Sequence, residues 1–154
     1  MKPTVKVIVL ENHFKDAAKA ASGDQLLKAL MTGGNVVQNH ARLNIQKQKL
    51  VDTSNLLNSI EVQPDENAET KALVSIGTNV IYAAIHEFGG TIVPRTKAML
   101  SWVSKSGERI FAKSVHIPAR PYLRPAIDEH EPEIANAIGQ ALVDQINGAL
   151  NGNA

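Results

Sequence analysis

Residues 24–49 read DQLLKALMTGGNVVQNHARLNIQKQK, and this stretch sets the central helix that the sequence predicts. Its apolar residues recur at helical spacing, and those expected to face inward are Leu26, Leu27, Leu30, Val37 and Ala41. Asp24 precedes them and is suited to cap the helix N-terminus. Gly33 and Gly34 each cost about 1 kcal/mol relative to alanine inside a helix, so they mark a kink or the close approach of another backbone. We predict a continuous but weakened helix that ends near Lys49.

Strand patterns lie on both sides of this helix. Residues 4–10 are mostly β-branched or apolar, which is typical of a strand. After a polar connection over residues 51–59, residues 60–62 and 72–76 flank the turn-forming sequence PDEN at 64–67. This arrangement predicts an antiparallel hairpin.

A short helix and a second hairpin are predicted further along the chain. Residues 79–88 are compatible with one or two helical turns, which Gly89 and Gly90 would close. Residues 99–103 and 109–112 have strand composition and flank a polar turn. The second hairpin is therefore expected to carry a basic, exposed tip.

The last helix is predicted to start near Tyr122. Acidic residues are concentrated in its first half, as the helix dipole favours, and Pro132 indicates either a bend or the true helix start. Together the elements predict one α+β domain over residues 1–154, with an antiparallel sheet of about four or more strands. Two main helices are expected on one face of this sheet, and residues 95–113 are expected to form a projecting, extended hairpin.

Composition limits the classes of protein to which the chain can belong. The 154 residues carry 16 Lys and Arg against 15 Asp and Glu, a formal net charge of +1, so no global field attracts nucleic acid or an anionic membrane. There is no cysteine, which excludes disulfides and thiolate metal sites. No apolar run reaches the roughly 18 residues of a transmembrane helix. We expect a soluble protein made in the cytoplasm.

His86 and Glu87 are the residues most suggestive of enzyme chemistry. The common zinc-hydrolase motif needs a second histidine four positions on, but that position is Gly90. The other histidines lack ligand spacing: His13, His40, His116 and His130. We predict no enzymatic activity, no metal site and no cofactor, with a metal-dependent hydrolase at His86 and Glu87 as an alternative.

Nucleic-acid binding by the basic hairpin is a second alternative. Its cations include Lys105, Arg109 and Lys113, with Trp102 and Phe111 between them. Aromatic rings and cations together can bind single strands. Alternation along the hairpin, however, places both rings in the sheet more naturally than on an exposed stacking surface, and lysine on exposed strands also prevents unwanted edge pairing.

Three stretches, taken in order, resemble one known family. They are DTSNLLNSI at 52–60, YAAIHEFGG at 82–90 and IPARPYLRPA at 117–126. The tailed-phage neck and tail-completion proteins, including the Mu-type virion-morphogenesis group, show similar T-G-x-L-x-x-S-I, Y-A-x-x-x-E-F-G and P-A-R-P-F-L-R-P-A segments before a last helix. Order and spacing both agree, and Tyr122 replaces the usual phenylalanine of the third segment.

This resemblance implies a structural subunit of the virion that has no enzymatic activity. It implies a homo-oligomeric ring, expected to be a hexamer, in the neck or at the head-proximal end of the tail, where it joins head to tail. The implied neighbours are the head-tail connector and the tail tube or tail terminator proteins. DNA would pass through the ring without sequence recognition, with Lys105, Arg109 and Lys113 facing the lumen or a partner ring. No membrane partner is implied.

Prolines suggest a physical role for the third stretch. Pro118, Pro121 and Pro125 fix their own φ angles and favour extended geometry in the preceding residues. Residues 117–124 are therefore predicted to form a stiff arm that leads into a helix at Pro125. A stiff arm loses little conformational entropy when it docks.

The side chains near this arm are of the types enriched at interfaces, with Tyr and Leu as anchors and Arg as bidentate donors. Glu87 is the predicted carboxylate partner of one arginine, within a subunit or across to its neighbour. In the alternative interpretation, Tyr122 and Leu123 only fasten the last helix to its own sheet. The predicted subunit or partner interface comprises Glu87, Phe88, Arg120, Tyr122, Leu123 and Arg124.

Overall fold

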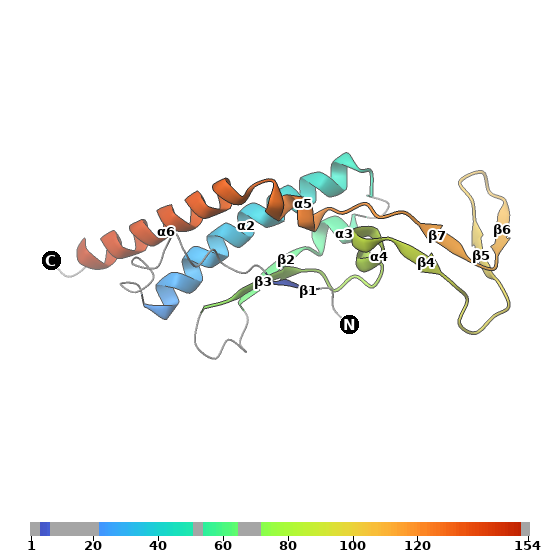
Figure 1. Cartoon of the computed structure of the whole chain (residues 1–154), viewed down its shortest axis with the longest axis horizontal. Coiled ribbons are helices and arrows are strands. Elements are labelled where there is room, and N and C mark those ends of the chain that lie inside the picture. The colour runs from blue at the N-terminus through green and yellow to red at the C-terminus, as the bar shows by residue number, and fades with distance from the viewer. Residues whose placement is uncertain (1–3, 7–21, 51–53, 65–71, 152–154) are drawn as a thin grey trace.

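The structure is a computed structural model that describes residues 4–6, 22–50, 54–64 and 72–151. Its helices are α2 (Gly23–Lys47), α3 (Asn55–Asn58), α4 (Ala83–Phe88), α5 (Leu123–Asp128) and α6 (Glu131–Asn151). Its strands are β1 (Thr4–Lys6), β2 (Glu61–Pro64), β3 (Val74–Gly77), β4 (Gly90–Ile92), β5 (Leu100–Val103), β6 (Arg109–Ala112) and β7 (Val115–Ile117). Figure 1 shows the long helices toward one end of the molecule and a projection built of strands at the other.

Helix α2 is capped by Ser22 rather than by Asp24. The Gln25 backbone amide donates to the Ser22 hydroxyl at 3.3 Å, and the Ser22 amide donates to the Gln25 side chain at 2.9 Å. This reciprocal capping box satisfies two amides that the helix leaves free. The predicted cap is therefore wrong by two positions, and Asp24 lies in the first turn, where its charge still suits the helix dipole.

The glycine pair allows neighbouring elements to approach α2, which runs through both glycines without interruption, as predicted. A Cβ atom on Gly33 would lie 2.5 Å from Cγ1 of Ile138 in α6. A Cβ atom on Gly34 would lie 2.5 Å from Cγ1 of Val62 in β2. Both distances are well inside van der Waals contact, so the approach that the sequence indicated is made by side chains rather than by a backbone.

The four-stranded sheet that the sequence predicts is not formed in the described residues. The largest sheet has three strands in the order β1-β3-β2, with antiparallel pairs throughout and Val62 opposite Ile76. The predicted hairpin over residues 60–76 is confirmed by the β2–β3 pair. Residues 7–10 of the predicted first strand lie outside the described residues. The remaining strands form two separate pairs, β4–β7 and β5–β6.

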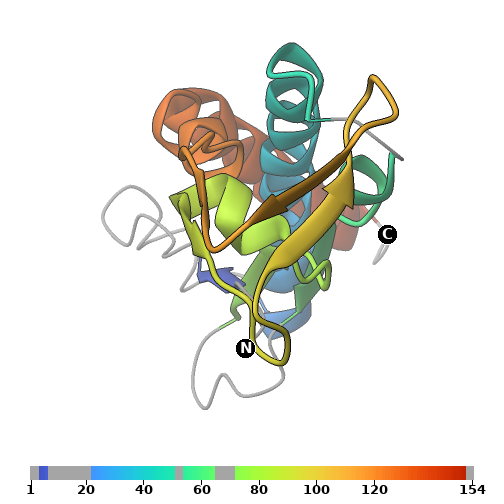
Figure 2. The ribbon, with the colours of Figure 1, turned by 90° about the vertical axis from the view of Figure 1, so that its right-hand side faces the viewer.

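Helices α2 and α6 lie side by side on one face of the three-stranded sheet (Figures 1 and 2). Side chains of both helices meet strand β3 around one small space in the core, lined by Leu30, Gly33, Gly34, Val74, Ile76, Ile134 and Ile138. Aliphatic residues make up most of this core, in agreement with an aromatic content of only 4%. The observed layers agree with the predicted α+β class.

Two local elements differ from the predictions. The helical segment after Tyr122 is divided into α5 and α6, with Glu129 and His130 between them, and Pro132 is the second residue of α6. Proline is tolerated in a first helical turn because those amides have no intrahelical acceptor. The predicted polar connection after α2 contains the short helix α3, whose buried Leu56 joins the core.

The projecting part of the molecule is a two-stranded ribbon that continues into a hairpin (Figure 1). Strand β4 pairs with β7, placing Thr91 opposite His116. Beyond them β5 pairs with β6, placing Trp102 opposite Ile110, so the second predicted hairpin is confirmed. From here on, residues 90–117 are called the arm, and the rest of the described chain is called the body. This arm is distinct from the stiff segment that the sequence predicts over residues 117–124. None of the described helices is long and apolar enough to span a membrane.

Candidate functional site

The arm joins the body at a junction organised by the Glu87 carboxylate. Glu87 lies in the last turn of α4 and is only 7% exposed. Its Oε2 accepts hydrogen bonds from the Tyr122 amide at 2.8 Å and the Leu123 amide at 3.0 Å, and its Oε1 accepts from the Arg124 amide at 2.9 Å. These amides belong to the start of α5, where a helix leaves donors unsatisfied and favours negative charge.

The predicted pairing of Glu87 with an arginine side chain is therefore wrong within the protomer. Three backbone amides occupy the carboxylate, and among the described ion pairs the guanidinium of Arg124 contacts Asp128 instead, at 3.7 Å. The physical reason is that a helix N-terminus offers several aligned donors to one buried acceptor. Such an arrangement compensates burial of the charge better than one flexible cation at the surface.

Further polar contacts hold the segment after β7 against α4 and α2. The Arg120 amide donates to the His86 carbonyl at 2.7 Å. From α2, the Gln48 side chain donates to the Pro121 carbonyl at 2.7 Å and the Asn44 side chain to the Tyr122 carbonyl at 3.1 Å. The prediction of an extended segment over residues 117–124 is wrong at its end, because α5 begins at Leu123, two residues before Pro125. Residues 118–122 form neither helix nor strand.

Glycine is required where α4 passes into the arm. Gly89 has φ 68°, in the left-handed region that disfavours other residues. A Cβ atom there would also lie 2.7 Å from the Ala119 backbone nitrogen. Gly89 therefore closes α4, as predicted, and allows the two chain segments of the junction to pass close together.

The six predicted interface residues divide into two groups. Tyr122 is 2% exposed and Leu123 is 3% exposed within the single protomer, and Glu87 is also buried. Their burial favours the alternative in which the anchors fasten the last helices to their own core. Phe88, at 65% exposed, and the exposed side chains of Arg120 and Arg124 are the predicted residues that remain available to another molecule.

Burial at the junction also changes the acidity of two side chains. Burial, with a further contribution from the Glu87 carboxylate, raises the pKa of the Tyr122 phenol. Burial lowers the pKa of His86 from 6.5, and the nearby Arg120 cation lowers it further. Burial therefore favours the uncharged form of both groups.

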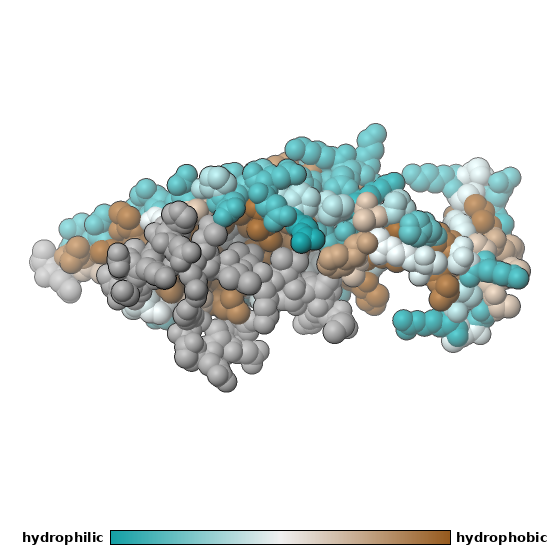
Figure 3. Space-filling view, in the orientation of Figure 1, coloured by the Kyte–Doolittle hydropathy of each residue, from teal (hydrophilic) through white to brown (hydrophobic). Residues whose placement is uncertain are grey.

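The arm exposes apolar side chains from both strands of its terminal hairpin. Trp102 and Val103 of β5 are 40% and 59% exposed, and Ile110 and Phe111 of β6 are 37% and 59% exposed. Figure 3 shows brown and tan patches among hydrophilic residues at this end of the molecule. Because neither face of β5–β6 is covered by another layer in the described chain, alternation does not hide the rings as predicted.

The cations of the hairpin lie on the same part of the arm. Lys105, Arg109 and Lys113 are all exposed, in agreement with the prediction of a basic, exposed tip. Because these three cations are exposed, they can contact either an anion or a partner that carries carboxylates. They share the hairpin with the exposed apolar side chains, so one docking event could involve both kinds of residue.

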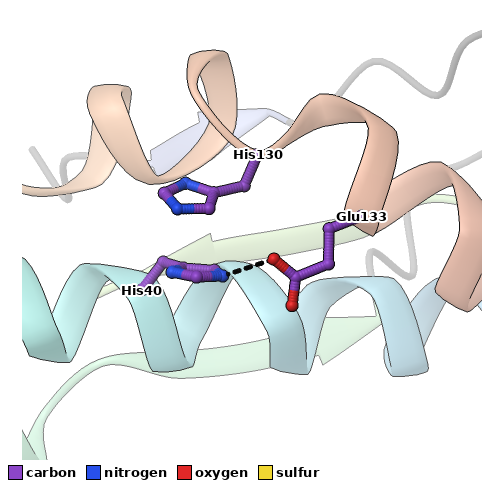
Figure 4. A group of neighbouring side chains, drawn as sticks. All are labelled: His40, His130 and Glu133. Atoms are coloured by element: carbon purple, nitrogen blue, oxygen red, sulfur yellow. Dashed lines mark hydrogen bonds and ion pairs between the residues drawn. The ribbon is translucent and has the colours of Figure 1, made fainter.

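A group of potential metal ligands forms elsewhere on the body. Among the described residues, three such side chains come together at His40, His130 and Glu133 (Figure 4). His40 belongs to α2, whereas the other two come from the α5–α6 corner. No spacing pattern indicates this group, because 90 residues separate the two histidines and only the packing of α2 against α6 brings them together.

The sequence of the chain matches a known protein family. The sequence profile of the phage virion morphogenesis family matches residues 17–145. The chain belongs to this family. As a member of the phage virion morphogenesis family, it has the Glu87 junction, the whole arm, α2 and most of α6 inside the matched region.

A curated relative of this family member comes from a prophage. The chain is 41% identical over 78 residues to Mu-like prophage FluMu G protein 2 of Haemophilus influenzae. The aligned region covers 51% of this chain and 41% of that protein, so the match spans well under half of the relative's length. No solved structure matches the chain.

Proposed function

We propose that this virion morphogenesis protein is a structural subunit that forms a ring at the head-tail junction and joins the phage head to the tail. The observation that carries the proposal is the arm, which projects from a well-packed body and exposes apolar side chains on both strands of its hairpin. Family membership supports a role in building the virion. The ring and its place in the neck are the proposed part.

The physical argument begins with the weakness of an isolated ribbon. Two strands without a covering layer are marginally stable in water, and their free edges invite pairing with another chain. The exposed Trp102, Val103, Ile110 and Phe111 add apolar surface of the kind that marks interaction sites. Covering this hairpin with another subunit would bury that surface and supply the missing layer.

The charges of the hairpin and of the body indicate which two surfaces meet when one copy docks on the next. The hairpin carries exposed cations, whereas the α5–α6 corner of the body carries the exposed acidic residues Asp128, Glu129, Glu131 and Glu133. The arm of one copy and the body of the next are therefore electrostatically complementary. A contact between two different surfaces is heterologous, and repeating it by a fixed rotation closes a ring, for which we propose six copies.

The exposed junction residues have a place in this arrangement. Phe88 lies at the end of α4, Arg120 lies on the segment that leads from the arm into α5, and Arg124 lies in the first turn of α5. They border the root of the arm, where an adjacent copy or a neighbouring neck protein would also make contact. Arg side chains and exposed aromatic rings are enriched in such contacts.

The test compares two charge insertions at exposed apolar positions, Phe111→Asp in the arm and Val143→Asp on α6. We expect Phe111→Asp to leave the unfolding temperature of the isolated subunit close to that of the unchanged protein. The same variant should abolish self-association in analytical ultracentrifugation and give particles with unjoined heads and tails in negative-stain images. Val143→Asp should assemble normally. Normal joining by Phe111→Asp, or equal failure of both variants, would refute a role for the arm.

A nucleic-acid-binding accessory role is the second candidate, because Lys105, Arg109 and Lys113 are exposed beside aromatic rings. In that case the purified protein should retain DNA in a salt-sensitive manner, and replacing all three cations with glutamine should reduce the salt dependence. If the cations only face the ring lumen or a partner ring, DNA retention by the isolated subunit should be negligible.

A further inference from the structure

The His40, His130 and Glu133 side chains form a compact group on the surface between α2 and the α5–α6 corner. Their potential ligand atoms all lie within 4.8 Å of one another. His40 Nε2 lies 2.8 Å from Glu133 Oε2, and the two imidazole rings are stacked with centroids 3.4 Å apart. Figure 4 shows both rings and the carboxylate gathered in one place between the two helical segments.

The protein atoms alone leave this group incompletely satisfied. Within the described residues, His130 Nδ1 is buried and has no hydrogen-bond partner, and its ring lies face to face with that of His40. A buried polar atom without a partner costs about 1–3 kcal/mol. A ligand that accepts electron pairs from both rings would remove this cost.

The donor set matches the preferences of a borderline divalent metal. Two imidazole nitrogens and one carboxylate oxygen form a common three-residue set for Zn²⁺, with the fourth tetrahedral position taken by water. Donors of one tetrahedral zinc lie roughly 3.3 Å apart, given metal-ligand distances near 2.0–2.1 Å. The present donor atoms lie up to 4.8 Å apart, so the side chains must reorient and draw together to bind one ion. Glu133 is 57% exposed at its side chain, so an ion can enter from solvent.

We propose that His40, His130 and Glu133 form a Zn²⁺ site that ties α2 to the α5–α6 corner. Binding replaces the hydrogen bond between His40 and Glu133 with two metal bonds. One imidazole ring turns about its Cβ–Cγ bond, because lone pairs of rings inclined by only 22° do not converge on a common point. Nothing in this proposal depends on ring assembly, since all three ligands belong to one protomer.

The role of such an ion would be structural. Helix α2 crosses the whole body, and α6 packs along it, so a bond between His40 and the α5–α6 corner closes a long loop of chain. An ion bound only by the folded state stabilises that state by mass action. At a hundredfold excess over Kd, the unfolding temperature of a chain of this size should rise by roughly 5–10 °C.

The experiment measures Zn²⁺ binding to the full chain after chelator treatment, by calorimetric titration. The unchanged protein should bind one ion per chain, and His40→Ala, His130→Ala and Glu133→Gln should each lose at least about tenfold in affinity. His116→Ala, which removes an exposed histidine of the arm, is the matched control and should bind normally. The same titration in acid should show weaker binding, because protons compete for the imidazole nitrogens.

Glu133→Gln separates a metal role from a merely structural one. A glutamine oxygen can still accept a hydrogen bond from His40, so the fold and the metal-free unfolding temperature should change little. Loss of binding together with an unchanged metal-free protein supports the site. Unaltered zinc affinity in Glu133→Gln or His40→Ala would overturn the proposal, as would binding that only His116→Ala weakens. Visible absorption of bound Co²⁺ should report tetrahedral coordination in the unchanged protein and vanish in the three ligand variants.

Discussion

Replacing Glu87 should reveal how strongly the junction supports the body. In Glu87→Gln, the remaining carbonyl oxygen can still accept hydrogen bonds from the Tyr122 and Leu123 amides, while the new NH₂ group faces the Arg124 amide. One charge-assisted hydrogen bond is lost and two become neutral. In Glu87→Ala, all three amides at the start of α5 lose their acceptor.

The magnitudes follow from these counts. A hydrogen bond to a charged group contributes about 1.5–3 kcal/mol, so Glu87→Gln should lower the free energy of unfolding by about 2–3 kcal/mol. Glu87→Ala should cost about 4–5 kcal/mol, because buried amides are left without partners. For a chain of this size these values correspond to decreases in unfolding temperature of roughly 5–10 °C and 10–20 °C.

Urea and thermal unfolding followed by circular dichroism would measure these changes, with Glu129→Gln as the control at an exposed carboxylate. Amide hydrogen exchange gives a local readout, because the amides of residues 122–124 should exchange faster in both Glu87 variants than in the control. If Glu87→Gln unfolds within about 0.5 kcal/mol of Glu129→Gln, the carboxylate does not act as described. The Glu87 variants are for this reason poor probes of an interface, whereas changes at Arg120 or Phe88 should leave the subunit intact.

Two further outcomes follow from the structure. Gly33→Ala should destabilise the protein by about 1–2 kcal/mol, because the added methyl group would meet Ile138. Gly148→Ala, on the open surface of α6, should instead stabilise the protein by about 0.5–1 kcal/mol. Chemical denaturation of both variants tests whether the two changes in the free energy of unfolding have opposite signs. The pKa of His86 is lower in the folded protein than its unfolded value of 6.5, so the unfolded chain binds more protons and stability should fall as pH drops below 6.5. His86→Gln should weaken this loss between pH 7 and pH 5, and an unchanged difference between the two pH values would show that burial beside Arg120 has no such effect.

Sequence patterns correctly predicted those elements that depend on interactions between residues close in sequence. The hairpin over residues 60–76 followed from a turn sequence between β-branched segments, and α4 followed from the glycines that end it. The continuous path of α2 through Gly33 and Gly34 was also correct. In each case the deciding interactions join residues close in sequence, so periodicity and turn chemistry contain the information needed.

Long-range contacts explain what the sequence could not predict. The expected sheet is divided because β4–β7 and β5–β6 leave the body instead of pairing with β2 or β3. Glu87 was identified as important, but its partners are amides 35 to 37 residues away whose direction depends on where α5 begins. His40 and His130 meet only after α2 and α6 have packed, so no spacing in the sequence could reveal them.

The adjacent glycines of α2 have a consequence for how the molecule can change shape. Neighbouring helix residues lie about 100° apart around the axis, so Gly33 faces Ile138 of α6 while Gly34 faces Val62 of β2. Rotating α2, or sliding it lengthwise, would bring bulkier side chains against both neighbours at once. The two glycines therefore fix both the rotation and the lengthwise position of α2 relative to α6 and β2.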